Sequence, residues 1–209
     1  MTPTNPQPTR IRLRKIAAAV VLLCFGGPRA EAHLVTTGLG PVYDGIAHLA
    51  LSPADLAVVV VLTLLAAMRG PRQGRWLLVL LPAAWLAGGL TGLMIPINAS
   101  FGWATGVSFL LAGALVAADR NLPLPVVATL AAVIGTFHGF LTGAAFARAP
   151  NGVFELTGTL VALFVIATLL AGLVVSIKAF WARVAVRVLG SWIAATGLLM
   201  IGWTLRPGN

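Results

Sequence analysis

The residues best suited to chemistry are His33, Asp44, His48 and Asp55, which lie close together in a chain that is 59% hydrophobic. Asp44 and His48 are four positions apart, so on a helix they share a face, and one can orient the other or bind the same ion. Asp55 returns to that face if the helix runs straight. Imidazole and carboxylate ligands suit a divalent nickel, cobalt, zinc or copper ion and are unsuited to a tight magnesium site.

His138, in the segment GTFHGFLTG, is a further candidate ligand because it lies deep within an apolar run. Ionisable residues at such depth usually face a cavity or a partner. Gly135, Gly139 and Gly143 form a ridge of small residues on which another helix can approach closely, so His138 has the alternative role of a hydrogen-bonding group between packed helices. The corresponding alternatives for Asp55 and Asp44 are a favourable charge in the first turn of a helix and a solvated loop residue.

The first 32 residues have the pattern of a signal peptide. A basic stretch, Arg10 to Lys15, precedes a short apolar segment and the small-x-small sequence Ala30-Glu31-Ala32. Cleavage after Ala32 would make His33 the first residue, whose free amine and imidazole can chelate one metal ion. The only cysteine, Cys24, belongs to this leader. The predicted mature domain, residues 33–209, therefore has no thiolate ligand.

The elements that must position these residues are membrane helices. The mean hydropathy is +0.97, only 9% of the residues are charged, and long apolar runs match the thickness of a bilayer. The sequence therefore predicts an all-α membrane protein, a single domain of six transmembrane helices after the cleaved signal peptide. The predicted spans are 53–68, 76–94, 101–118, 123–146, 154–177 and 184–205.

A short helix is expected ahead of the first span. Gly40-Pro41 and Ser52-Pro53 are both typical of helix starts, and the segment between them is too short to cross a bilayer. It should lie at the outer interface or form a re-entrant segment.

The distribution of basic residues predicts the orientation. Most arginines and Lys178 fall in short clusters such as RGPRQGR and KAFWARVAVR, between alternate pairs of spans. This is typical of cytoplasmic loops and argues against nucleic-acid binding as their role. The protein would then lie in the inner membrane of a bacterium with its mature amino terminus in the periplasm. The signal peptide independently predicts the same location for this terminus. All five candidate residues, and Glu155 at the start of the fifth predicted span, map to the outer face or the outer half of the bilayer, which would let them converge. For Glu155 the role of a favourable charge at a helix start is preferred.

These motifs resemble those of the HupE/UreJ family. The resemblance is carried by the small-x-small site directly before His33, by TGLGPVYDGIAHLALSPADL ahead of the first span, and by GTFHGFLTG in a later helix. It implies a membrane accessory protein of nickel hydrogenase or urease systems, regarded as a nickel or cobalt permease. It also implies that Asp44, His48 and His138-Gly139 correspond to the residues of the family's motifs. Better-known members place the first Asp and His side by side, whereas DGIAHL separates them.

We therefore predict a permease or accessory protein for a divalent transition metal, nickel or cobalt first and zinc or copper next. Its expected partners are membrane lipid, the metal ion, a metalloenzyme maturation system and further copies of the chain. The sequence contains no P-loop, which makes direct coupling to ATP improbable. Two alternatives remain at this point. One is an intramembrane zinc-dependent hydrolase using the same His and Asp residues, although HExxH is absent. The other is a metal-binding membrane subunit that does not transport.

Overall fold

The computed structural model of the chain describes residues 36–95, 97, 101–176 and 179–206. Every described residue belongs to one compact unit, Leu34–Asn209. The predicted signal peptide, its cleavage site and His33 therefore lie outside the described residues.

All the regular structure in the described part of the chain is α-helical. Prolines stand at the starts of several helices, where the missing N–H and the fixed φ angle of proline are well tolerated. The helices are α2 (Pro41–Leu51), α3 (Pro53–Ala67), α4 (Pro71–Met94), α5 (Gly102–Ala118), α6 (Leu124–Phe146), α7 (Gly152–Ser176) and α8 (Phe180–Thr204).

Helices α3 to α8 coincide with the six predicted spans to within a few residues. Within the described ranges, α4, α6, α7 and α8 are long and apolar enough to cross a membrane, and α2 with α3 makes a fifth candidate if that bent pair is one span. Helix α5 has 17 residues and α3 has 15, both below the length of about 20 that a bilayer requires. The described part of the chain is thus all α-helical, and the protein is a multi-pass membrane protein. That it has six spans remains a prediction.

The expected short helix is present as α2. It is separated from α3 by Ser52, whose extended backbone is favoured because Pro53 follows it. The axes of α2 and α3 differ by 74°. This break turns α2 away from α3 and onto α7, where the backbone of Gly45 lies against that of Glu155 so closely that a Cβ atom would overlap it.

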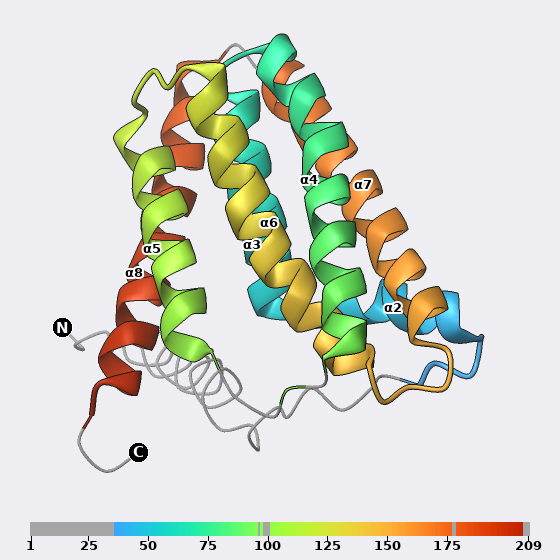
Figure 1. Cartoon of the computed structure of the whole chain (residues 1–209). Coiled ribbons are helices and arrows are strands. Elements are labelled where there is room, and N and C mark those ends of the chain that lie inside the picture. Colours follow the sequence, from blue (N-terminus) through green and yellow to red (C-terminus); the bar gives the residue numbers. More distant parts are fainter. Residues whose placement is uncertain (1–35, 96, 98–100, 177–178, 207–209) are drawn as a thin grey trace, which may run out of the picture. The chain divides into compact units, whose positions relative to one another are not determined.

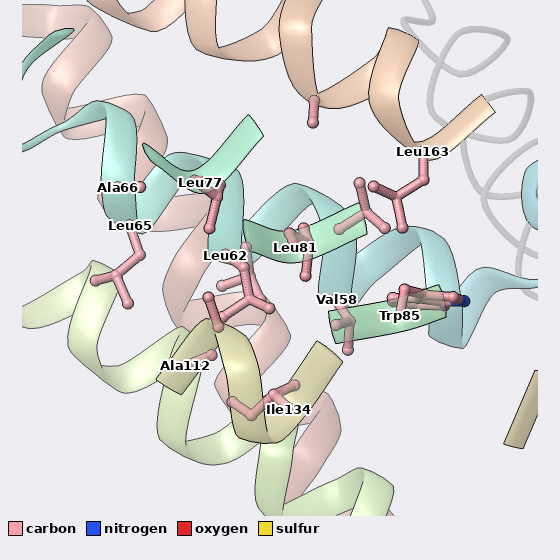
Figure 2. Packing of buried hydrophobic residues seen from close by; sticks show 14 of the residues in the cluster. Val58, Leu62, Leu65, Ala66, Leu77, Leu81, Trp85, Ala112, Ile134 and Leu163 are labelled. Atoms are coloured by element: carbon pink, nitrogen blue, oxygen red, sulfur yellow. The ribbon is translucent and has the colours of Figure 1, made fainter. Parts of the chain in front are cut away.

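The remaining helices pack around α3. Helices α4 and α6 form one close pair and α5 and α8 another, and successive helices run in alternating directions (Figure 1). Most of α3 is buried, and its Val58, Leu62 and Leu65 pack with Leu81 of α4 and Leu163 of α7 in the apolar core (Figure 2). Because the directions alternate, the start of α3 and the last turns of α6 lie at the same end of the bundle.

Candidate metal site

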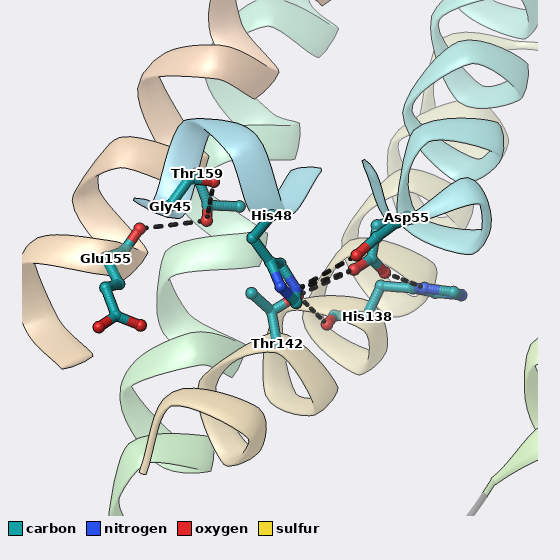
Figure 3. Close-up of polar contacts among 8 residues, drawn as sticks. Gly45, His48, Asp55, His138, Thr142, Glu155 and Thr159 are labelled. Carbon is teal, nitrogen blue, oxygen red and sulfur yellow. Dashed lines mark hydrogen bonds and ion pairs between the residues drawn. The ribbon is translucent and has the colours of Figure 1, made fainter. Parts of the chain in front are cut away.

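Asp55 stands between two histidines that come from different helices. Its carboxylate oxygen Oδ1 lies 3.1 Å from Nδ1 of His138 in α6, and Oδ2 lies 3.7 Å from Nε2 of His48 in α2 (Figure 3). The Asp55 side chain is only 13% exposed, at the start of α3. The break at Ser52 is what allows this, because His48 reaches Asp55 from a helix that lies across α3 instead of continuing it.

His138 is held on both sides of its ring. It is 1% exposed, and Nε2 lies 3.1 Å from Oγ of Ser108 in α5. Trp85, Phe109 and Phe137 surround the imidazole. Since a carboxylate only accepts hydrogen bonds, Nδ1 donates to Asp55. Both ring nitrogens are therefore engaged within the protein.

The direction in which the Ser108 hydroxyl donates its hydrogen bond determines whether the His138 ring carries one proton or two. The Ser108 hydroxyl also lies 2.7 Å from the Thr105 carbonyl oxygen. A hydroxyl has one hydrogen, so if it donates to Thr105, then Nε2 of His138 must donate to Ser108 and the ring is an imidazolium. If it donates to Nε2, the ring is neutral. In both arrangements Nδ1 keeps its proton and continues to donate to Asp55.

His48 has a freer nitrogen. Its Nε2 is 3.7 Å from Oδ2 of Asp55 and 3.5 Å from Oγ of Ser52, both longer than a good hydrogen bond. The ring is 7% exposed and packs edge-on against Phe146, with the centroids 4.7 Å apart. Thr142, one turn after His138, approaches the same carboxylate oxygen of Asp55 at 3.5 Å. The loosely held pair in this cluster is therefore Nε2 of His48 with Oδ2 of Asp55.

The cluster is a hydrogen-bonded arrangement and does not have the form of a complete ligand cage. Within the described residues, no three His, Cys, Asp or Glu side chains are grouped so as to hold a metal ion. Any ion at this site must therefore bind to fewer protein ligands, complete its shell with water, or bring further groups into place.

Asp44 does not join the cluster in this structure. It shares α2 with His48, but its carboxylate accepts hydrogen bonds from the backbone N–H and the hydroxyl of Thr37, at 2.5 and 2.6 Å. This contact ties the loop before α2 to the first turn of the helix. Among the described residues, Asp44 is the sequence candidate that the structure does not bring to Asp55. His33 lies outside the described residues.

Glu155, for which the sequence favours the role of a charge at a helix start, is a buried neighbour of the site. It is 8% exposed in the first turn of α7, close enough to Asp44 and His48 to interact with their charges. Figure 3 shows its carboxylate pointing away from Asp55. Thr159 fixes the α2–α7 contact by placing its hydroxyl 3.0 Å from the Gly45 carbonyl oxygen. An acid at a helix start looks the same in sequence whether or not it is buried, so the burial of Glu155 could not be predicted from the pattern.

The contact order Ser108, His138, Asp55 resembles that of a serine hydrolase triad, but the surroundings do not support hydrolysis. Ser108 is buried within α5 and is not part of a nucleophile elbow. Of two cavities in the described part of the chain, one between α7 and α8 and one beside α6, neither is lined by Ser108. The likeness to a triad therefore lies in the order of the contacts alone.

The opposite end of the bundle carries a second charged cluster. Asp119 follows α5 in a left-handed conformation (φ 50°) and forms ion pairs with Arg183 of α8, at 2.6 Å, and Arg69 after α3, at 3.0 Å. The hydrogen bond from Arg183, assisted by Arg69, holds the pKa of the Asp119 carboxyl below its usual value. Helices α3 and α5 therefore each extend from the Asp55–His138 cluster to this arginine cluster.

The comparison with known proteins agrees with the motifs. The HupE / UreJ protein family matches residues 20–200 of the chain. No curated protein and no solved structure matches it. Members of the family are generally membrane proteins for nickel or cobalt transport, or accessory proteins of that kind, and are not known as enzymes. Because the match covers most of the sequence, the chain belongs to the HupE/UreJ family.

Proposed function

We propose that this chain is a permease or accessory protein for nickel or cobalt ions, with an outer-facing site at which His48 and Asp55 bind the ion. The observation that carries the proposal is the pair formed by Nε2 of His48 and Oδ2 of Asp55, 3.7 Å apart, largely buried, and too far apart to bond each other well. One nitrogen and one carboxylate oxygen suit such ions.

The spacing of this pair is compatible with a shared ion. Imidazole nitrogens and carboxylate oxygens bind divalent transition metals at about 2.0–2.2 Å. Two such ligand atoms that are 3.7 Å apart would subtend an angle of roughly 120° at the ion, given those bond lengths. Small side-chain movements would bring the angle to the tetrahedral or octahedral value, with water filling the other positions.

In this account His138 positions the carboxylate. Its Nδ1 donates to Oδ1 of Asp55, and its Nε2 is engaged with Ser108, so it orients the ligand without contacting the ion. Such partners of metal ligands typically contribute 10- to 100-fold to affinity. The alternative, in which His138 itself binds the metal, requires the ring to give up the Ser108 contact.

Further acidic groups would attract the ion towards the pair. Asp44 and Glu155 lie near His48, and negative charges lining an approach raise the local concentration of cations. We further propose that cleavage after Ala32 leaves His33 as the first residue, where its amine and ring provide a second binding point on the same side. A site with so few ligands would release its ion readily, as transport requires.

The same proposal includes six spans in a bacterial inner membrane, with the mature amino terminus in the periplasm. Helix α5 is short, but its Ser108 contacts His138 at the metal-site end, and Asp119 just after it pairs with Arg69 at the arginine end. Helix α3 joins the same two ends, so α5 and α3 cover about the same depth. This supports α5 and α3 as true spans. The arginine-rich end would face the cytoplasm, where a metalloenzyme maturation system could receive the ion.

Nickel and cobalt uptake by cells that express the full chain tests the function. His48→Ala and Asp55→Asn should abolish uptake while the protein still reaches the membrane in normal amount, because each change relieves the cost of burying an ionisable group. Asp119→Asn, at the other end, serves as the control and should retain uptake. Full uptake by the His48 variant would exclude the proposed site.

A further inference from the structure

A cavity lies at the arginine end, away from Asp55. It has a volume of about 780 Å³ and is bounded by the last turns of α3, the start of α4, the end of α7 and the start of α8. Helix α7 packs on α2, α3 and α4, whereas α8 packs mainly on α5, so the two helices leave a space between them that α3 closes from behind. The volume is within the range of ordinary ligand sites.

The walls of this cavity are mostly apolar. Leu64 and Met68 of α3, Leu170 and Val174 of α7, and Leu189 of α8 are among the lining residues. A cavity with such walls in a membrane helix bundle suits a hydrocarbon chain, and it offers a hydrated ion or polar metabolite no compensation for lost hydration. Its natural occupant is therefore one acyl chain of a lipid.

The residues at one edge have the chemistry of a lipid headgroup region. Trp181 and Phe180 line the cavity and are 71% and 84% exposed, and tryptophan side chains concentrate at the level of the headgroups. Arg183 lines the same edge. Two of its five guanidinium N–H groups are directed at Asp119, which leaves others to contact a phosphate oxygen.

The charge balance at this end favours an anionic partner. Among the described residues of this end, Asp119 is the only acid, whereas six arginines are present: Arg69, Arg72, Arg75, Arg120, Arg183 and Arg187. Arg69 is 3% exposed, and its Nε and Nη2 find no partner among the described residues. A basic edge beside an apolar space between helices fits the phosphate of an anionic lipid better than a zwitterionic headgroup.

We propose that this cavity is a binding site for an anionic phospholipid, with one acyl chain between α7 and α8 and the phosphate at Arg183. The lipid would fill the space that α7 and α8 leave open and would brace the α5–α8 pair against α3. The site is independent of metal binding, because none of its lining residues belongs to the cluster around Asp55.

Native mass spectrometry of the full chain in detergent tests the proposal, with phosphatidylglycerol, phosphatidylcholine and inorganic phosphate as probes. Phosphatidylglycerol adducts should survive at about fivefold lower lipid concentration than phosphatidylcholine adducts, which is the order expected for one arginine at a headgroup. Arg183→Gln should abolish this preference. Arg187→Gln makes the same charge change one turn later, at a residue that does not line the cavity. This variant should keep the preference for phosphatidylglycerol.

A second pair of variants tests the acyl-chain part without touching an ion pair. Ala185→Trp fills the cavity and should weaken retention of both lipids, whereas Val184→Trp, whose position does not line the cavity, should leave retention unchanged. Equal binding of the two lipids would overturn the proposal, and so would equal effects of the two arginine variants or of the two tryptophan variants. Displacement of the lipid by inorganic phosphate at the same concentration would also overturn it, because it would indicate a simple anion site.

Discussion

Asp55 and His138 are 83 positions apart in the chain, and yet Oδ1 of the first lies 3.1 Å from Nδ1 of the second within a buried cluster. This contact determines which oxygen of Asp55 is committed and which remains for a ligand. Oδ1 is held by His138, whereas Oδ2 faces His48 across a wider gap. The two histidines of the site therefore have different roles, one orienting the carboxylate and the other available to bind.

Substitutions of His138 should separate these roles. An asparagine amide occupies about the place of Nδ1 and can donate to Asp55, whereas glutamine places its amide near Nε2 and leucine provides no donor. We expect His138→Asn to keep most of the nickel affinity, and His138→Gln and His138→Leu to lose about 10- to 100-fold, as for other groups that orient a metal ligand. Isothermal titration of the purified protein with nickel measures this. Equal losses in all three variants would instead make His138 a direct ligand.

The close approach of α4 and α6 should be sensitive to one methyl group. A Cβ atom on Gly143 would overlap the backbone carbonyl of Gly89, which cannot move aside as a flexible side chain can. Gly143→Ala should therefore destabilise the protein by about 1–3 kcal/mol and displace α6, which carries His138. Gly172→Ala is the matched control, because nothing lies within 4 Å of its Cβ position. Thermal unfolding in detergent should show a lower transition for the first variant only; equal transitions would mean that the helices are not so close.

The ion pairs of Asp119 should make part of the stability depend on pH. The folded state lowers the pKa of this carboxyl below the ordinary 3.8, so the stabilisation is complete above 3.8 and is lost as the pH falls through the folded-state pKa. Asp119→Asn should lower the unfolding temperature at pH 7, and the difference from the unmodified protein should shrink below pH 3.8. Asparagine also tolerates the left-handed conformation, so the variant removes the charge of Asp119 without straining the backbone.

The control for this experiment is the neighbouring Arg120→Gln, which changes a charge outside the ion-pair cluster and should leave the unfolding temperature nearly unchanged. If Asp119→Asn also left it unchanged at pH 7, the ion pairs would add nothing to stability. Nickel binding should be the same in both variants, since both positions lie at the end opposite Asp55.

Reporter fusions test the topology and the number of spans. A fusion after Arg72 should behave as cytoplasmic and a fusion after Arg206 as periplasmic, because six spans return the chain to the side of its mature amino terminus. The fusion after Arg206 is the sensitive one. If the 17-residue α5 did not cross the membrane, the parity would change and this fusion would be cytoplasmic, which would contradict the six-span arrangement.

Hydropathy and helix-start signals predicted the helices well. The six apolar runs and the short helix before them are all helical in the structure, because long apolar stretches and N-terminal prolines are local signals. The break at Ser52 was also visible in the sequence as Ser-Pro, but its consequence was not. A pattern of spacing assumes one straight helix, and a bend of 74° alters which residues share a face.

The site was predictable only in part for the same reason. His48, Asp55 and His138 were expected to converge, and they do. Asp44 shares a helix with His48, but it bonds to Thr37, which precedes the helix. Ser108 gave no signal, because a serine in an apolar helix is common and its contact with His138 depends on how α5 packs. Such pairings arise from tertiary contacts that single-sequence spacing does not contain.

The most direct test of the central claim is equilibrium dialysis of the purified full chain against nickel and against cobalt, with bound metal measured per folded protein. We expect saturable binding by the unmodified protein and by His138→Asn, and loss of binding by His48→Ala and Asp55→Asn while their size-exclusion profiles stay unchanged. If folded His48→Ala and Asp55→Asn both bound as much nickel and cobalt as the unmodified protein, the claim that these two residues hold the ion would be contradicted.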